Sequence, residues 1–290
     1  MMKKVLIIGK NSYIARKFVD YLCMLNQSDI EIHGVSASNG EWKKISFKGY
    51  DSILFLAGKV HQKETRDNVK EYGEINYKLA MEVAKKAKNS HVKQFIYMST
   101  AAVYGNAGQE RGNVRIDENS PCIPKTAYGM SKRKAEIKLL ELESRADVTM
   151  NICIVRPPMV YGDNCPGNFT RLWKLALKTP VFPLLHNERS MIDIDNLCEF
   201  LYQIIIQEKR GIYHPQDKEY VDTSKLVGDM RKQEGKKMFY VKLGNPLLRV
   251  LVKKIEVVEK VFGNYTYEKE MSVYEGIEYQ KYGVEDVVRR

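Results

Sequence analysis

This chain has little of what builds a membrane span or an export signal. Its apolar runs, such as Val5–Ile8 and Ile204–Ile206, are far shorter than the ~18 residues that a membrane-spanning helix needs. Only four apolar residues follow Lys4 before Gly9, too few for the core of a signal peptide. We therefore expect a protein that does not cross a membrane and that resides in the cytoplasm.

Clustered metal or disulfide ligands are also missing. The five cysteines and five histidines are scattered, without a Cys-x-x-Cys pair or a His-Glu-x-x-His spacing. The cysteines are Cys23, Cys122, Cys153, Cys165 and Cys198. We expect reduced, mostly buried thiols, no disulfide framework and no metal site.

Acidic residues are the minority, with 36 Asp and Glu against 47 Lys and Arg, for a net charge of +11. Such a charge suits nucleic acid, an anionic membrane surface or a phosphorylated substrate. No RNA-binding aromatic signature and no zinc-finger spacing accompanies it, so we expect no nucleic-acid partner. Hydrophobic residues at 44% and charged residues at 29% are enough for a large core and a solvated surface, so the chain folds.

The first half of the chain alternates between strand and helix patterns. Short all-apolar runs predict buried strands, and apolar residues at helical spacing predict helices. The strands are predicted at 5–8, 30–35, 52–57, 94–99 and 151–155, and the helices at 13–25, 75–88 and 128–142, with a loop before residue 124. This alternation predicts an α/β fold with a doubly wound parallel sheet of the Rossmann type.

The pattern changes near residue 165, where proline and glycine crowd a short span and the alternation ends. We expect a dinucleotide-binding domain over residues 1–165 and a smaller C-terminal substrate-binding lobe over residues 166–290. Helices are predicted there at 169–178, 194–207, 223–234 and 246–262, and the segment of about 190–210 is expected to pack back on the core.

The turn after the first strand is a Gly-x-x-Gly-x-x-Gly frame in which serine and alanine replace the later glycines. It reads Gly9-Lys10-Asn11-Ser12-Tyr13-Ile14-Ala15. Gly9 permits a sharp turn, Ser12 lies where a backbone approaches a pyrophosphate at a helix N-terminus, and Ala15 is small enough to pack on the sheet. An ordinary strand-to-helix turn is the alternative.

Tyr128 and Lys132 stand four residues apart near the start of a predicted helix, so they share one face. A nearby cation favours the phenolate, so Lys132, helped by an oxidised nicotinamide ring, is expected to lower the pKa of Tyr128 from its ordinary value of about 10. A tyrosine so tuned moves protons during alcohol and ketone interconversion. A chance surface pair on a helix is the alternative.

Ser99 and Thr100 lie at the end of a predicted buried strand, where open α/β sheets bind ligands. Thr100 is therefore expected to hydrogen-bond a substrate oxygen beside Tyr128. Capping of the strand end by these hydroxyls is the alternative.

These features occur together, in this order, in one known family. The chain resembles the extended short-chain dehydrogenases/reductases of the NAD-dependent epimerase/dehydratase family, and most closely the UDP-glucose 4-epimerase-like branch. The resemblance runs from Val5 to about Gln207. It rests on the first turn and on Leu56-Ala57-Gly58, Asn76, Ser99–Gly105, Tyr128–Lys132, Arg156–Gly162, Gly167-Asn168-Phe169 and Arg189–Asn196.

The resemblance implies roles for individual residues. Tyr128 would be the catalytic acid and base, Lys132 would bind the nicotinamide ribose and lower the pKa of Tyr128, and Thr100 would orient the sugar hydroxyl. The implied cofactor-binding residues are Gly9, Asn11, Ser12, Tyr13, Ile14, Ser36, Ala57, Gly58, Asn76, Ser99, Tyr128, Lys132 and Pro157.

The resemblance also implies that Asn168 and Arg189 hold the pyrophosphate of the substrate. Arginine suits this task because its planar guanidinium donates to two phosphate oxygens at once. A buried, structural Arg189 paired with Asp193 or Asp195 is the alternative.

Two departures from the family pattern bear on the cofactor and the reaction. After the second strand, residues 35–38 read Val-Ser-Ala-Ser and offer no acidic residue for a ribose hydroxyl, so NAD and NADP both stay open. Ala101 and Ala102 follow Thr100 in place of the acid and base that drive water loss in the family's dehydratases. Dehydration is therefore the least expected reaction.

The predicted function is 4-epimerisation of a nucleotide sugar, a UDP-hexose or UDP-N-acetylhexosamine for surface polysaccharide, by transient oxidation at C4 with bound NAD. The alternatives are a reductase that consumes NAD(P)H on a 4-keto sugar nucleotide, and a non-catalytic dinucleotide-sensing protein. From the resemblance we expect a homodimer formed through the helices that carry Asn76 and Tyr128.

The predicted helix at 246–262 is basic and amphipathic. Its apolar residues can share one side, with basic residues among them, as in helices that lie on anionic bilayers. These apolar residues are Leu247, Leu248, Leu251, Ile255, Val258 and Phe262. A peripheral membrane contact with a lipid-linked substrate is one interpretation, and ordinary packing of that side onto the core is the other.

Overall fold

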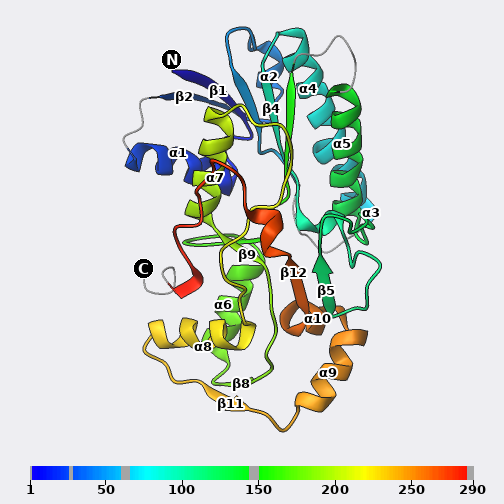
Figure 1. Ribbon diagram of the computed structural model, residues 1–290, viewed down its shortest axis with the longest axis vertical. Coiled ribbons are helices and arrows are strands. Elements are labelled where there is room, and N and C mark those ends of the chain that lie inside the picture. Colours follow the sequence, from blue (N-terminus) through cyan, green and yellow to red (C-terminus); the bar gives the residue numbers. More distant parts are fainter. Residues whose placement is uncertain (1, 26–28, 60–65, 144–149, 286–290) are drawn as a thin grey trace.

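The computed structural model describes residues 2–25, 29–59, 66–143 and 150–285 (Figure 1). Six strands form its central sheet: β1 (Lys3–Ile8), β2 (Ile30–Val35), β3 (Ser52–Phe55), β4 (Gln94–Met98), β6 (Asn151–Val155) and β10 (Gly211–Tyr213). Their order is β10-β6-β4-β3-β1-β2, and every neighbouring pair is parallel. The predicted α/β fold with a doubly wound parallel sheet is confirmed.

The sheet has an apolar core on each face because successive residues of a strand point to opposite sides. Val5 and Ile7 of β1 belong to one core, and Leu6 and Ile8 belong to the other. The helices that complete the first core are α1 (Tyr13–Met24) and α7 (Ile194–Ile206), and those that complete the second are α4 (Ala80–Asn89) and α5 (Ala127–Glu143). An all-apolar strand such as β1 therefore has both faces covered.

The order of the strands reverses between β1 and β3, because the chain continues from β1 to β2 on one side and then to β3 on the other. Doubly wound sheets bind ligands at the carboxyl ends of the strands at such a point. Here a Cβ on Gly9 would lie only 2.6 Å from the backbone N of Ala57, and Gly9 has a φ of 102°. The two strand ends therefore meet at a turn that only glycine fits.

The helix predicted at 75–88 is longer in the structure. It begins with α3 (Arg66–Tyr72) and continues through a π-helical segment, η1 (Gly73–Leu79), into α4. A further short helix, α2 (Glu41–Lys44), lies in the segment after β2 that shows no clear pattern in the sequence.

The loop predicted before residue 124 contains two elements. They are a 3-10 turn, η2 (Ala101–Val103), and a strand, β5 (Asn113–Ile116). The partner of β5 is β12 (Asn264–Tyr267), from the far end of the chain. Four-residue strands with distant partners leave little local signal, which explains why the sequence analysis missed them.

We call six elements together the C-terminal lobe, which lies at the end of the molecule opposite the N-terminus in Figure 1. They are α6 (Asn168–Lys178), β8 (Val181–Pro183), α8 (Thr223–Gln233), β11 (Phe239–Val241), α9 (Asn245–Lys254) and α10 (Glu256–Phe262). β8 pairs with β11, and the rings of Phe182 and Phe262 pack with centroids 5.4 Å apart. The prediction of one helix at 246–262 is wrong, because the backbone of Ile255 is extended and separates α9 from α10.

The sheet also draws on residues after 165. α7 shares the apolar core of α1, and β10 is the edge strand beside β6. Three more elements are β7 (Met159–Tyr161), which pairs with β9 (Met191–Asp193), and the 3-10 turn η3 (Lys269–Ser272). The division of the chain into residues 1–165 and 166–290 stays a prediction.

The described part of the chain holds no helix with both the length and the apolar character of a membrane span. All five cysteines are free, and Cys153, Cys165 and Cys198 are buried.

Candidate active site

Helix α5 carries Tyr128 in its first turn and Lys132 one turn later, and both side chains are buried. Gly129 brings this turn close to η2, since a Cβ at Gly129 would lie 2.6 Å from the carbonyl O of Ala102. A larger residue at this position would push α5 away from the turn that follows β4. The absence of a side chain at Gly129 thus sets how near Tyr128 comes to Thr100.

The Tyr128 phenol lies between Thr100 and Tyr72. It hydrogen-bonds the Thr100 side chain, and its ring meets that of Tyr72 edge-on with 6.0 Å between centroids. Burial raises the pKa of Tyr128 to about 12, while the Thr100 hydrogen bond opposes this shift and Tyr72 adds to it. The expectation of a lowered pKa is wrong for the protein alone, because the loss of water around the phenolate dominates.

The Lys132 ammonium reaches the end of β4. Its Nζ donates to the carbonyl O of Met98 at 2.8 Å and lies 4.7 Å from the centroid of the Tyr97 ring. Burial lowers the pKa of Lys132 to about 7, and the charge of Glu136 opposes that shift. The amine therefore populates both protonation states near neutral pH.

Asn76 ties the end of β3 to α5. Its Oδ1 accepts from the backbone N of Lys59 at 2.9 Å, and its Nδ2 donates to the carbonyl O of Lys59 and to Ser131 Oγ, both at 3.1 Å. A Cβ on Gly58 would lie 3.3 Å from both Asn76 Oδ1 and Lys132 Nζ. The structure thus brings three predicted cofactor-binding residues, Gly58, Asn76 and Lys132, to one place.

A buried charged network behind the end of β4 escaped the sequence analysis. Glu136 accepts from Arg156 Nε at 2.9 Å and from Arg156 Nη2 at 2.8 Å. Ser99 Oγ donates to Glu136 Oε1 at 2.5 Å, so the Ser99 hydroxyl is engaged with a carboxylate. A signal was present in the sequence, because Glu136 follows Lys132 by four residues and Tyr128 by eight, on the same helix face.

The first turn places Gly9 and Ser12 at the point where the strand order reverses. Ser12 N donates to the carbonyl O of Gly9 at 3.0 Å, and Ser12 Oγ accepts from Ala15 N at 3.2 Å as the N-cap of α1. Its hydroxyl hydrogen remains available for donation to a ligand. Gly9 N donates to the carbonyl O of Val35 at 2.9 Å, which brings Ser36, the residue after β2, alongside the turn.

The other predicted cofactor-binding residues surround this turn in different environments. Asn11 is exposed and Ile14 is partly buried. The Tyr13 hydroxyl donates to the carbonyl O of Asp163 at 3.0 Å, which ties α1 to the segment after β7. Pro157 is buried, and its carbonyl O accepts from the first backbone N of η2 at 3.0 Å.

Asn168 and Arg189, predicted to hold the substrate's pyrophosphate, have different environments. Asn168 is exposed at the N-terminus of α6. Arg189 Nη1 donates to the carbonyl O of Gly263 at 2.9 Å, at the end of α10. Asp193, named above as an alternative partner, accepts from two backbone N atoms as the N-cap of α7.

Tyr265 connects Arg189 to η2, the turn that follows Thr100, and the sequence analysis missed it. The two residues form a parallel β-bridge, and Tyr265 Oη donates to the carbonyl O of Ala101 at 2.9 Å. Since Ala101 follows Thr100, Tyr265 links the backbone beside Arg189 to the residue next to Thr100. Its strand, β12, has only a distant partner, so no local pattern marks it.

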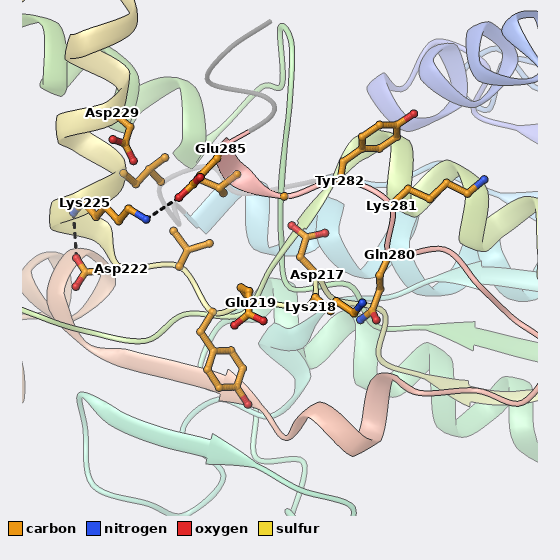
Figure 2. A pocket seen from close by; sticks show the side chains of 15 residues that line it. Asp217, Lys218, Glu219, Asp222, Lys225, Asp229, Gln280, Lys281, Tyr282 and Glu285 are labelled. Atoms are coloured by element: carbon orange, nitrogen blue, oxygen red, sulfur yellow. Dashed lines mark hydrogen bonds and ion pairs between the residues drawn. The ribbon is translucent and has the colours of Figure 1, made fainter.

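A separate pocket of about 640 Å³ lies between residues 217–229 and 280–285 (Figure 2). Acidic side chains such as Asp217 and Asp229 line it, and Lys225 Nζ there donates to Glu285 Oε1 at 2.7 Å. None of the predicted site residues lines this pocket. It therefore belongs to a different part of the molecule from the Tyr128 site.

The residues around Tyr128 fit a diphosphate-containing cofactor and an alcohol or ketone substrate. The glycine turn leads into the N-terminus of α1, whose free backbone N–H groups favour a diphosphate. The bare backbone at Gly58 leaves space beside Lys132. Tyr128 supplies a proton donor and acceptor, and Thr100 a second hydroxyl, at the carboxyl end of β4.

Comparison with known proteins agrees with this chemistry. The model of the NAD dependent epimerase/dehydratase family matches residues 5–214. The UDP-glucose 4-epimerase of Vibrio cholerae is 26% identical over 253 residues, which cover 79% of this chain and 75% of that protein. The N-acetyl-alpha-D-glucosaminyl-diphospho-ditrans,octacis-undecaprenol 4-epimerase of Escherichia coli O157:H7 is 29% identical over 206 residues, which cover 69% of this chain and 59% of that protein.

A solved structure shares the fold across the whole chain. It is the UDP-glucuronic acid 4-epimerase from Bacillus cereus in complex with NAD, with a TM-score of 0.72 and 17% sequence identity over 99% of this chain and 96% of that one.

Proposed function

This chain belongs to the NAD-dependent epimerase/dehydratase family, and we propose that it inverts the C4 configuration of a UDP-hexose or UDP-N-acetylhexosamine by transient oxidation. The observation that carries the proposal is the buried Tyr128 phenol, hydrogen-bonded to Thr100 and set one helical turn from Lys132. Bound NAD would supply the chemistry of accepting hydride from C4 and returning it.

Tyr128 would hold the proton that the reaction moves. As phenolate it takes the proton of the C4 hydroxyl, and as phenol it returns the proton to the ketone. Thr100, which hydrogen-bonds the phenol, orients the same sugar oxygen. A positive charge favours the phenolate, so protonated Lys132 and an oxidised nicotinamide would together offset the raised pKa of Tyr128.

Two serines would meet the adenosine ribose. Ser36 Oγ and Ser38 Oγ lie 3.0 Å apart at the end of β2, where neutral hydroxyls replace a selective carboxylate. An epimerase needs no net reduction, so we propose NAD as its resident cofactor, with NADP as the alternative for a reductase.

A reductase acting on a 4-keto sugar nucleotide is the second candidate. With a pKa of about 12, Tyr128 is a protonated phenol at neutral pH, and this is the form that donates a proton to a ketone. The two functions differ in stoichiometry, because a reductase consumes one NAD(P)H per product and an epimerase consumes none.

The carrier of the sugar is a further variable within the proposal. The E. coli relative is named for a sugar linked through diphosphate to undecaprenol. UDP-sugars and such lipid-linked sugars both present a sugar diphosphate, so Asn168 and Arg189 suit either. The assay therefore offers both kinds of substrate.

The test is incubation of the purified chain with each substrate and NAD, or with a 4-keto sugar nucleotide and NAD(P)H. NMR reports the configuration at C4, and absorbance reports the reduced cofactor. We expect C4 inversion without accumulation of reduced cofactor. Stoichiometric loss of NAD(P)H on the ketone without inversion would establish the reductase instead.

Tyr128→Phe is the matched variant for this assay. It keeps the ring and removes the hydroxyl that exchanges the proton. We expect the rate to fall at least about a hundredfold, the usual contribution of a positioned acid or base to the rate. Tyr50→Phe is the control, because the Tyr50 hydroxyl hydrogen-bonds Nδ1 of the exposed His33, at 2.6 Å. An unchanged rate in Tyr128→Phe would favour a non-catalytic, dinucleotide-sensing protein.

We also propose a homodimer formed through the helices that carry Asn76 and Tyr128. Met130 and Ile137 are large apolar residues of α5 that the single chain leaves exposed. A dimer that M130D/I137D converts to a monomer in light scattering is the expected result. A wild-type monomer would contradict it.

A further inference from the structure

The segment from β11 through α9 lies at the end of the molecule opposite the N-terminus (Figure 1). It exposes large apolar side chains. Leu243 is 93% exposed, Leu247 64% and Val250 50%. Residues 247 and 250 are three apart on α9, so their side chains share one side of that helix. All three residues of β11 are exposed as well.

These side chains are not needed for the packing of α9. The helix is held by its opposite side, where Val252 is buried against Gly112, and a Cβ on Gly112 would lie 2.2 Å from Val252 Cγ1. Leu248 and Leu251 are partly buried on that inner side. The sequence analysis placed Leu247 with them, whereas the structure separates an inner apolar side from an outer one.

The segment that carries the outer side has charged residues of one sign only. Between residues 235 and 254 the chain has six basic residues and no acidic one. They are Lys236, Lys237, Lys242, Arg249, Lys253 and Lys254. Lys253 is paired with Glu110 at 2.7 Å, outside this segment.

This combination distinguishes between possible occupants. In a symmetric pair of chains the same patch meets itself, so its basic residues would face basic residues. Like charges facing each other disfavour association. An anionic bilayer instead supplies negative head groups for the basic residues and an apolar layer for the leucines.

We propose that residues 235–254 form a docking surface for an anionic lipid bilayer. Leu243, Leu247 and Val250 enter the boundary between head groups and acyl chains, and the flanking lysines and Arg249 contact lipid phosphates. The full chain then acts at a membrane surface. This surface is separate from the Tyr128 site, so the proposal does not rest on the proposed reaction.

The test is co-sedimentation of the full chain with vesicles of phosphatidylglycerol and phosphatidylcholine, compared with vesicles of phosphatidylcholine alone. We expect binding to the anionic vesicles that weakens as salt is added. L243D/L247D should lower the bound fraction at least tenfold. M24D/V273D is the matched control, since it makes the same charge change at residues that are 82% and 72% exposed elsewhere, and it should bind like the wild type.

Three results would overturn the proposal. They are no binding of the wild type to anionic vesicles at low salt, equal losses of binding in both double variants, and a change of oligomeric state in L243D/L247D without vesicles. The last result would make the surface an interface between copies of the chain. Turnover of a soluble UDP-sugar by L243D/L247D should match the wild type, so a failure of the reaction and a failure of docking are distinguishable.

Discussion

The sheet half of the molecule and the C-terminal lobe differ in the kind of side chain that they bury and expose. Around the sheet ends, Lys132, Glu136 and Arg156 are charged groups held away from water. At the end of the lobe, the apolar side chains of Leu243 and Leu247 are exposed to water. Each arrangement costs free energy that simple folding would avoid, and each lies where we propose a task beyond folding.

The difference shows which region needs side chains in fixed positions. The proposed proton transfer requires that Tyr128 and its neighbours keep fixed positions, and the hydrogen bonds of Asn76, Ser99 and Glu136 hold the surrounding elements together. Meeting a partner surface requires apolar area that stays uncovered until the partner arrives. The following substitutions test whether the two regions differ as much as this comparison says.

Arg156→Met should have the largest effect on stability. It leaves the buried carboxylate of Glu136 without the guanidinium that donates to both of its oxygens. We expect a loss of about 3–5 kcal/mol in the free energy of unfolding. Chemical denaturation measures this loss. The control is Arg115→Met, which removes an exposed ion pair with Glu268 and should change stability by less than about 1 kcal/mol. Equal losses of stability in the two variants would contradict the predicted difference between the buried and the exposed ion pair.

Lys132→Met should change how stability depends on pH. The folded pKa of Lys132 is about 7, below its unfolded value of 10.5, so above pH 7 the unfolded chain binds more protons and rising pH favours the folded state. From about pH 7.5 to about pH 9, the wild type should gain about 2 kcal/mol relative to the variant. Denaturation at several pH values measures this gain. The exposed Lys134→Met is the control, and a difference that stays constant with pH would contradict the prediction.

Gly129→Ala should have an intermediate effect. The added Cβ would come within 2.6 Å of the carbonyl O of Ala102, and overpacking of this kind costs about 1–3 kcal/mol. Activity should fall too, because Tyr128 moves away from Thr100. Gly73→Ala is the control, since nothing lies within 4 Å of a Cβ there. A fully active and stable Gly129→Ala would show that α5 tolerates a shift.

Leu247→Ala in the lobe should have the smallest effect, within about 0.5 kcal/mol, because the side chain is mostly exposed. The same substitution at Leu139 of α5, which is fully buried, should cost about 2–5 kcal/mol. Thermal or chemical denaturation of both variants measures the pair. A large loss in Leu247→Ala would mean that the lobe depends on this side chain for its folding.

The sequence alone was sufficient to predict the sheet and the proximity of Thr100 and Tyr128. All-apolar strands and the glycine turn predict a doubly wound sheet because both signals are local. The Tyr128–Lys132 spacing and the strand end at Thr100 are local as well. Their meeting follows from the rule that the carboxyl ends of parallel strands lie on one edge of the sheet.

Features that depend on distant contacts or on burial could not be predicted. Tyr265, which donates to Ala101 of η2, belongs to β12, whose partner β5 lies about half the chain away. The direction of the Tyr128 pKa shift depends on how much water surrounds the phenol, which no spacing reports. The break at Ile255, which divides the predicted amphipathic helix, likewise escaped the sequence analysis.

The central claim is that Tyr128 is a buried phenol whose pKa falls when a positive charge lies nearby. The most direct test is an ultraviolet pH titration of the wild type minus that of Tyr128→Phe, with and without NAD. The account predicts a Tyr128 pKa of about 12 in the protein alone, and a decrease of about 1–3 units once the oxidised cofactor binds. A phenol that titrates near 10 in both conditions, or whose pKa does not respond to NAD, would contradict it.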